Sequence, residues 1–167
     1  GMTLVELLVV LGMMGLLLAL ASPTFSSFSE ASRYKKGARE LASVIRIARS
    51  RAISTGYEHR VQIDIPNRKF RLTQGNRYAG STASSWDHNV ITDWQLLSPG
   101  ISLRGNLDCS VESGVIYFHA NPNGTTNTRY LCLTDDLGKF RFRVGIPYAV
   151  TGKVLIHQWM PGSEAWH

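Results

Sequence analysis

A single carboxylate inside an otherwise uncharged N-terminal segment constrains this chain more than any other feature. Glu6 carries the only charge in the first 29 residues, and an apolar run from Leu7 to Ala21 follows it directly. About 20 such residues in a helix, rising about 1.5 Å each, span the roughly 30 Å hydrocarbon core of a bilayer. Because an ionisable group is costly there, Glu6 is predicted to be functional and to have a cationic partner.

Two other interpretations of this segment are available. A cleaved secretory signal peptide would have basic residues before a shorter apolar core and a small-x-small cleavage site. Ala19-Leu20-Ala21 has the small-x-small pattern, but no basic residue precedes the apolar core. The other alternative is an ordinary signal anchor with a chance glutamate. Both explain the apolar run, and neither explains why its one charge is a carboxylate at this position.

The rest of the chain predicts one helix followed by β-structure. After a kink expected at Pro23, helical periodicity resumes and forms an apolar stripe of Leu41, Val44, Ile45, Ala48 and Ala52, with Lys35, Arg39 and Arg46 opposite and Gly56 as the stop. Alternation predicts a hairpin over 61–65 and 70–72, and further strands over 94–97, 101–103, 115–118, 129–133, 140–144 and 153–159. Residues 74–89 are predicted to be a long loop, which is a candidate for partner choice.

These elements define an α+β fold in which the helix lies across an antiparallel sheet. The expected organisation is a membrane half of the helix over 1–28, an amphipathic half over 29–56, and a β-rich globular domain over 57–167. About 115 residues past position 52 suffice for one compact domain with a modest core. The chain is basic, with 18 Lys and Arg against 12 Asp and Glu, which favours phosphates of lipid or nucleic acid.

The first six residues, Gly1-Met2-Thr3-Leu4-Val5-Glu6, resemble the N-terminal signature of type IV pilins and of type II secretion pseudopilins. The resemblance implies that a prepilin peptidase cuts between Gly1 and Met2, removing a basic leader, and that the new amine on Met2 is N-methylated. Glu6 would then pair with the N-terminal amine of a neighbouring subunit. The physics agrees, since a buried carboxylate needs a cation. Gly12 and Gly15 would allow close helix packing, or are routine membrane-helix residues.

Later motifs are similar to the GspH/FimT family of minor pilins and pseudopilins. They are Ala48-Arg49-Ser50-Arg51-Ala52-Ile53, Val115-Ile116-Tyr117-Phe118, Pro122-Asn123-Gly124, Cys132-Leu133 and Asp136-Leu137-Gly138-Lys139. The resemblance implies the type IV pilin fold and a single-pass inner-membrane precursor with a periplasmic domain, which then moves to the pilus. Its partners would be other minor pilins and the major pilin, and it would prime assembly at the filament tip, as FimU-like members do. The alternative machine is type II secretion.

Two cysteines, Cys109 and Cys132, are the only ones in the chain. A periplasmic or extracellular domain allows disulfides to persist, and an even count favours one bridge. Such a bridge would stabilise the domain by roughly 3 kcal/mol in the chain-entropy model. The alternative is two free buried thiols. Their spacing matches no zinc motif, and two ligands are too few for a structural site.

Binding of DNA is the second functional hypothesis. FimT members carry a Gly-Arg-x-Arg motif near the C-terminus, and the matching stretch here is Gly152-Lys153-Val154-Leu155. Lys153 replaces the first arginine and the second is missing, which weakens phosphate contacts. Arg141 and Arg143, expected on one face of a strand, would contribute instead, unless they simply mark a solvent face.

The basic cluster Arg33, Lys35, Lys36 and Arg39 is expected to meet inner-membrane lipid phosphates before assembly, or to form salt bridges with neighbouring pilins. Enzymatic activity is not expected. The histidines are scattered, and neither a nucleophile elbow nor a phosphate-binding glycine loop is present. We accordingly expect no cofactor and no metal.

Overall fold

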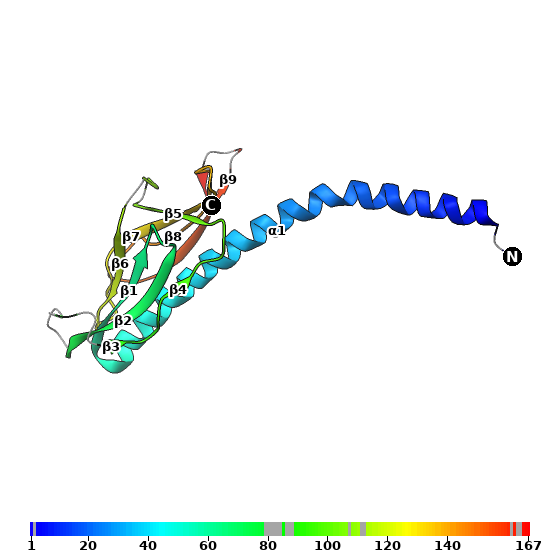
Figure 1. Ribbon diagram of the computed structural model, residues 1–167. Coiled ribbons are helices and arrows are strands. Elements are labelled where there is room, and N and C mark those ends of the chain that lie inside the picture. The colour runs from blue at the N-terminus through cyan, green and yellow to red at the C-terminus, as the bar shows by residue number, and fades with distance from the viewer. Residues whose placement is uncertain are drawn as a thin grey trace. The chain divides into compact units, whose positions relative to one another are not determined.

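The computed structural model describes residues 1, 3–78, 85, 89–106, 108–110, 113–160, 162 and 165–167, and for residues 18–29 it describes the backbone only. The chain divides into two compact units, Gly1–Arg33 and Tyr34–His167. Helix α1, Leu4–Thr55, contributes residues to both units (Figure 1). The long N-terminal helix predicted from the sequence is therefore confirmed. Pro23 lies within α1, and the kink expected there stays a prediction.

The end of α1 follows the predicted pattern. Gly56 has a positive φ of 72°, and its N–H donates to the carbonyl of Ala52 at 3.1 Å. A left-handed glycine directly after the last turn satisfies a terminal carbonyl without the steric cost that other residues pay. The predicted apolar stripe is also confirmed, because Leu41, Ile45, Ala48 and Ala52 are buried and Val44 packs beside them.

The first sheet contains β1 (Tyr57–Asp64), β2 (Lys69–Tyr78), β3 (Asn89–Val90), β4 (Gln95–Leu96) and β6 (Val115–Ala120). Its order is β3-β2-β1-β6, with β4 also paired to β2 (Figure 1). The predicted hairpin is β1–β2, whose register places Ile63 opposite Phe70. Asp64 closes the turn, since its carboxylate accepts the backbone N–H of Asn67 at 3.1 Å.

The second sheet contains β5 (Ser102–Gly105), β7 (Arg129–Thr134), β8 (Phe140–Ile146), β9 (Leu155–Met160) and β10 (Ala165–Trp166). Its order is β10-β9-β8-β7-β5, and every pair is antiparallel. The strand predicted over 153–159 is thus shifted, because Lys153 and Val154 precede β9.

Two antiparallel sheets replace the single sheet expected from the sequence, because the hairpin between β6 and β7 opens after one bridge, Ala120 to Thr126. The Asn127 side chain then takes the place of a strand. Its Oδ1 accepts the backbone N–H of His119 at 2.7 Å, and its Nδ2 donates to the carbonyl of Tyr117 at 3.0 Å. A side-chain amide offers one donor and one acceptor, which is what a sheet edge requires.

The predicted loop over 74–89 is wrong at its start, where residues 74–78 extend β2. Polar residues and a glycine in this stretch are typical of a loop, but pairing with β1 holds it as a strand. In that pairing Tyr57 lies opposite Tyr78, with the two ring centroids 5.3 Å apart. Residues 79–84 and 86–88 of that loop lie outside the described residues.

One hydrophobic core lies within the unit 34–167. It joins the buried stripe of α1 to alternate residues of both sheets, among them Phe70, Phe118 and Leu131, all nearly inaccessible to solvent. Burial of each such side chain contributes about 1.5–3 kcal/mol relative to exposure. The core therefore fixes α1 against the strands within this unit.

Candidate functional site

The start of α1 has a hydrogen-bonding arrangement that the sequence analysis missed. The Thr3 hydroxyl accepts the backbone N–H of Glu6 at 3.3 Å, and the Glu6 carboxylate accepts the backbone N–H of Thr3 at 3.3 Å. This reciprocal pattern is a capping box, in which a threonine and a glutamate three positions later satisfy orphan donors. The T-x-x-E spacing in the sequence could have revealed it. Glu6 therefore has a local role in addition to the intermolecular role predicted for it.

Gly1 is exposed, whereas Met2 lies outside the described residues. The predicted cleavage between them and the methylation of Met2 stay predictions. Glu6 itself is exposed in the isolated chain. Its carboxylate is within reach of the Thr3 hydroxyl, at 3.4 Å, as well as of the backbone N–H.

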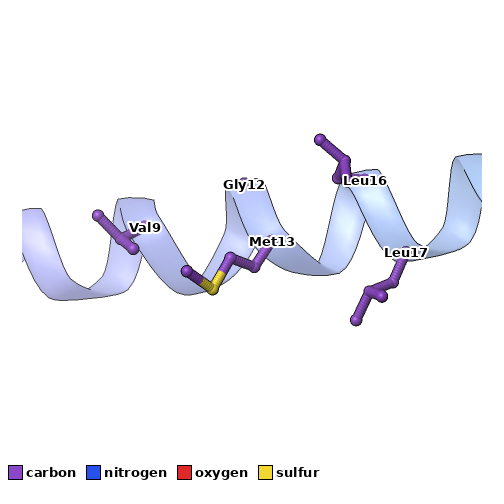
Figure 2. A pocket seen from close by; sticks show the side chains of 5 residues that line it. All are labelled: Val9, Gly12, Met13, Leu16 and Leu17. Carbon is purple, nitrogen blue, oxygen red and sulfur yellow. The ribbon is translucent and has the colours of Figure 1, made fainter.

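The first unit presents an apolar surface along α1. The side chains from Leu4 to Leu17 are exposed, with Leu16 at 66% and Leu17 at 67%. A shallow hollow of about 400 Å³ lies over Val9, Gly12, Met13, Leu16 and Leu17. Figure 2 shows Met13 extending back along the helix toward Val9, while Gly12 has no side chain to fill the space beside them.

Among the residues that the structure describes, a Cβ at Gly12 or at Gly15 would meet nothing within 4 Å, so neither glycine is needed there for packing. An exposed apolar surface of this extent is typical of a binding surface for protein or membrane.

Within the residues that the structure describes, no helical stretch combines the length and the hydropathy that a membrane span needs.

Cys109 and Cys132 form a disulfide, as predicted, with their Cα atoms 5.6 Å apart. Both residues are buried. The bridge ties the segment after β5 to β7, the strand with which β5 pairs. It closes a loop with a sequence separation of 23 residues.

The two arginines predicted to share one face of β8 do not share it. The pairing of β7 with β8 has an irregularity between Leu133 and Thr134, where Thr134 pairs with Phe140 and Leu133 with Phe142. The register thus shifts at Arg141, whose guanidinium stacks on the ring of Tyr34 from α1, at 5.7 Å, and pairs with Asp135 at 3.2 Å. A bulged residue redirects its side chain in this way.

Arg143 lies among aromatic rings on the second sheet. Its guanidinium carbon is 5.0 Å from the Tyr130 ring centroid and 4.7 Å from that of Trp166. Burial lowers the pKa of its guanidinium, against a smaller opposing effect of Tyr130. Trp166 in turn contacts Trp159 and Phe140, with centroids 5.1 and 5.9 Å away. Arg143 thus anchors an aromatic cluster rather than standing out from the strand.

The glycine of the predicted DNA motif has a packing role. Gly152 has a φ of 57°, and a Cβ there would lie 2.8 Å from Cδ of Arg49 and 3.0 Å from the Gly124 carbonyl oxygen. Arg49 donates to that same carbonyl at 2.9 Å. The next residue, Lys153, is exposed. Gly152 is therefore required by the contact between α1 and two turns, independently of any ligand.

Three solved structures share this architecture. The minor pseudopilin EpsH from the type II secretion system of Vibrio cholerae has a TM-score of 0.55 at 17% identity, covering 75% of this chain and 97% of that one. Escherichia coli GspH has a TM-score of 0.55 at 12% identity, covering 77% and 90%. The Pseudomonas aeruginosa type IV minor pilin FimU has a TM-score of 0.51 at 15% identity, covering 84% and 96%. The chain has the type IV pilin fold.

No protein-family model matches the sequence, and no curated protein is similar to it. The fold is thus recognisable in three dimensions at identities of 12–17%. These neighbours are pilin and pseudopilin subunits rather than enzymes. Among the described residues of this pilin-fold chain, no three His, Cys, Asp or Glu side chains gather as a metal site would need.

Histidines and one aspartate of the pilin-fold domain have shifted pKa values. Burial is the main cause that lowers the pKa of His59, His119 and His157, each below the ordinary 6.5. His59 is fully buried, and its Nδ1 lies 3.0 Å from the carbonyl oxygen of Tyr57. The Asn67 side chain, as hydrogen-bond donor, lowers the pKa of Asp64. All four groups belong to the unit 34–167, and we expect their protonation to affect the stability of this domain.

Proposed function

We propose that this chain is a minor subunit of a pilus-type filament, where it joins other minor pilins at the tip and primes assembly. The observation that carries the proposal is the combination of a pilin-fold domain with an exposed apolar helix that bears one carboxylate. Because one fold can serve many functions, the proposal depends on Glu6 and the apolar surface of α1 as well as on the fold.

The apolar surface from Leu4 to Leu17 supports packing between helices of neighbouring subunits. Small residues allow helix backbones to approach closely in apolar surroundings, and Gly12 lies at the hollow between Val9, Met13 and Leu16. Before assembly the same surface would be covered by lipid of the inner membrane, with the β-rich domain on the periplasmic side. Assembly then exchanges lipid contacts for contacts with the major pilin and other minor pilins.

Glu6 is proposed to pair with the N-terminal amine of a neighbouring subunit. That amine would be produced when a prepilin peptidase cuts between Gly1 and Met2, and its methylation would leave the positive charge in place. An uncompensated carboxylate among apolar helices is costly, while a paired one is tolerated. This requirement would set the axial position of one subunit relative to the next.

The disulfide between Cys109 and Cys132 supports a periplasmic or extracellular location, since disulfides persist in oxidising compartments. A pseudopilin of type II secretion is the alternative within the same class. Neither the fold nor the helix surface distinguishes the two machines. The DNA-receptor hypothesis stays a prediction, and the contacts of Arg141 and Arg143 within the domain give it no added support.

The test is a strain that lacks only this chain, complemented with the wild-type chain or with Glu6→Gln. Surface pili are counted by electron microscopy, and secretion of a type II substrate and uptake of labelled DNA are measured in the same cells. Loss of pili that the wild type restores and Glu6→Gln does not restore supports the proposal. Normal pili with lost secretion would assign the chain to the secretion machine. Normal pili and secretion would refute a role in either filament.

A further inference from the structure

Three connections between strands meet where α1 enters the unit 34–167. Together with the first turn of α1 in this unit, the connections β1–β2, β4–β5 and β7–β8 form what we call the entry end. The Tyr34 hydroxyl donates to the carbonyl of Gly100 at 2.7 Å. The backbone N–H of Leu97 donates to the carbonyl of Arg68 at 2.9 Å, and the Arg68 guanidinium lies 3.9 Å from the Asp136 carboxylate. We propose that the entry end docks on the headgroup layer of a membrane that contains anionic lipids.

Two leucines are exposed at the entry end. Leu137, in the connection β7–β8, is 84% exposed, and Leu96, at the end of β4, is 74% exposed. Among the described residues of the domain, no other large apolar side chain is as exposed as Leu137. Side chains in this position add little to the core, because they stay in water when the chain folds. Their removal from water is therefore available to stabilise contact with a partner.

Exposed lysines lie at the same end. They are Lys35, Lys36 and Lys139. The two carboxylates of the connection β7–β8 are each beside a guanidinium, because Asp135 lies 3.2 Å from Arg141 and Asp136 is paired with Arg68. These pairs offset the local negative charge, so the lysines give the entry end a positive character. Each Lys near an anionic membrane surface adds to the attraction.

An aromatic cluster borders the entry end on the side of the second sheet. Phe140 is the first residue of β8 after the connection β7–β8. Its ring centroid is 5.6 Å from that of Trp159 and 5.9 Å from that of Trp166, and all three side chains are partly exposed. Tryptophan is enriched where proteins cross the boundary between lipid and water, because its ring is apolar and its N–H is polar.

Leucines and lysines alone do not select this end of the domain. The opposite end also has an exposed apolar residue and a lysine, Val150 at 80% and Lys153. It lies beside the last turns of α1, since Gly152 is in contact with Arg49. The entry end, by contrast, is where the chain arrives from the exposed apolar part of α1. With that part in lipid before assembly, the entry end is the one next to the headgroups, and this step rests on the proposed function.

A lipid surface fits these features better than a protein partner does. A stable protein interface buries roughly 800 Å² on each partner, around a fully buried centre that is depleted of charge. The entry end instead offers leucines on separate connections, with charged side chains near them. A headgroup layer accepts single apolar side chains together with cations, because its phosphates need no fixed geometry.

The test uses the full chain in lipid vesicles, with an environment-sensitive dye on Leu96→Cys. The two native cysteines form a disulfide, so the introduced thiol is the one that reacts. Quenching of the dye by acrylamide in the water phase should fall about twofold or more when phosphatidylglycerol is mixed into phosphatidylcholine vesicles, because docking takes the dye out of water. The same dye on Val150→Cys is the matched control, and its quenching should stay the same in both lipids.

Substitutions in the chain labelled at Leu96→Cys identify the side chains that hold the docked state. Leu137→Glu should return the quenching to its value in phosphatidylcholine. Lys139→Gln should weaken docking about fivefold, as expected for the loss of one cation near an anionic surface. Lys153→Gln makes the same change at the opposite end and should have no effect. Circular dichroism of each variant separates loss of docking from loss of folding.

Three outcomes would overturn the inference. The first is equal quenching of the dyes on Leu96→Cys and Val150→Cys in chain that floats with anionic vesicles. That result would leave the proposed filament role intact, because pili and secretion measure that role separately. The second is an equal effect of Lys139→Gln and Lys153→Gln, which would mean general electrostatic attraction. The third is protection that disappears when the chain is diluted with more of the same lipid, which would assign the entry end to contact with a second copy of the chain.

Discussion

Two substitutions at the start of α1 separate the local role of Glu6 from its proposed role between subunits. Glu6→Gln keeps a side chain that can complete the capping box, since glutamine serves at this position as glutamate does, but it removes the charge. Thr3→Ala removes the hydroxyl that accepts the Glu6 N–H and leaves the carboxylate. If pairing with a neighbouring amine drives assembly, the first change should be severe and the second mild.

The expected magnitudes differ enough to decide between these roles. Loss of an N-cap hydroxyl costs about 0.5–2 kcal/mol, and the 3.3 and 3.4 Å distances here indicate the lower end. Leaving a buried charge without its partner costs about 3–5 kcal/mol. Each 1.4 kcal/mol corresponds to about tenfold in an equilibrium constant, so Glu6→Gln should reduce incorporation by about a hundredfold or more. Thr3→Ala should reduce it by less than about tenfold.

The assay is an immunoblot of this chain in sheared filaments, divided by the amount that remains with the cells. Its control is the size of the processed chain, which should match the wild type in both variants if the peptidase acts before pairing. Wild-type incorporation of Glu6→Gln would refute the charge-pairing argument. Equal failure of Thr3→Ala would show that helix initiation, and not charge, limits assembly.

Three further predictions concern the domain. Gly152→Ala should lower the free energy of unfolding, measured by urea denaturation, by about 2 kcal/mol or more, because Gly152 has a positive φ and lies against Arg49. The control is Gly162→Ala, since a Cβ at Gly162 would meet nothing within 4 Å. This control should change the free energy of unfolding by less than about 0.5 kcal/mol. The free energy of unfolding should fall as the pH drops below 6.5, because burial lowers the pKa of His59 and the unfolded chain then binds more protons than the folded chain. His59→Gln should make the free energy of unfolding less dependent on pH. An unchanged dependence would contradict the role given to His59. Reduction of the disulfide should cost about 3 kcal/mol, and equal thermal midpoints with and without reductant would contradict it.

The sequence predicted those elements whose signal is local. The stripe through Leu41, Ile45 and Ala48 and the alternation around Phe70 and Leu72 are set by the period of helix and strand, so burial in the structure follows them. Gly56 ends α1 for a backbone reason that is visible in the chain itself. Glu6 and the two cysteines were singled out for the same reason, since their chemistry is informative without knowledge of the fold.

Features that depend on pairing between distant segments were not predictable. At the boundary between the two sheets lies Asn127, a polar residue in the connection between β6 and β7, whose side-chain amide bonds to the edge of β6. The irregularity at Thr134 turns Arg141 away from Arg143, although simple alternation places them together. The strand character of residues 74–78 comes from pairing with β1 and not from composition.

The same contacts change how the net charge of +6 should be interpreted. Many of the cationic side chains already contact carbonyls, a carboxylate or aromatic rings within the domain. They are Arg46, Arg49, Lys69, Arg71, Arg141 and Arg143. A guanidinium held in this way must give up existing interactions before it can contact a phosphate, and its contribution to binding is reduced accordingly. Lys35 and Arg39 are exposed and line a pocket within the unit 34–167, so an anion can reach their side chains directly. Attraction of this chain to an anionic partner should therefore depend on α1 near Arg39 more than on the C-terminal segment around Lys153, and charge reversal at the two positions would measure that difference directly.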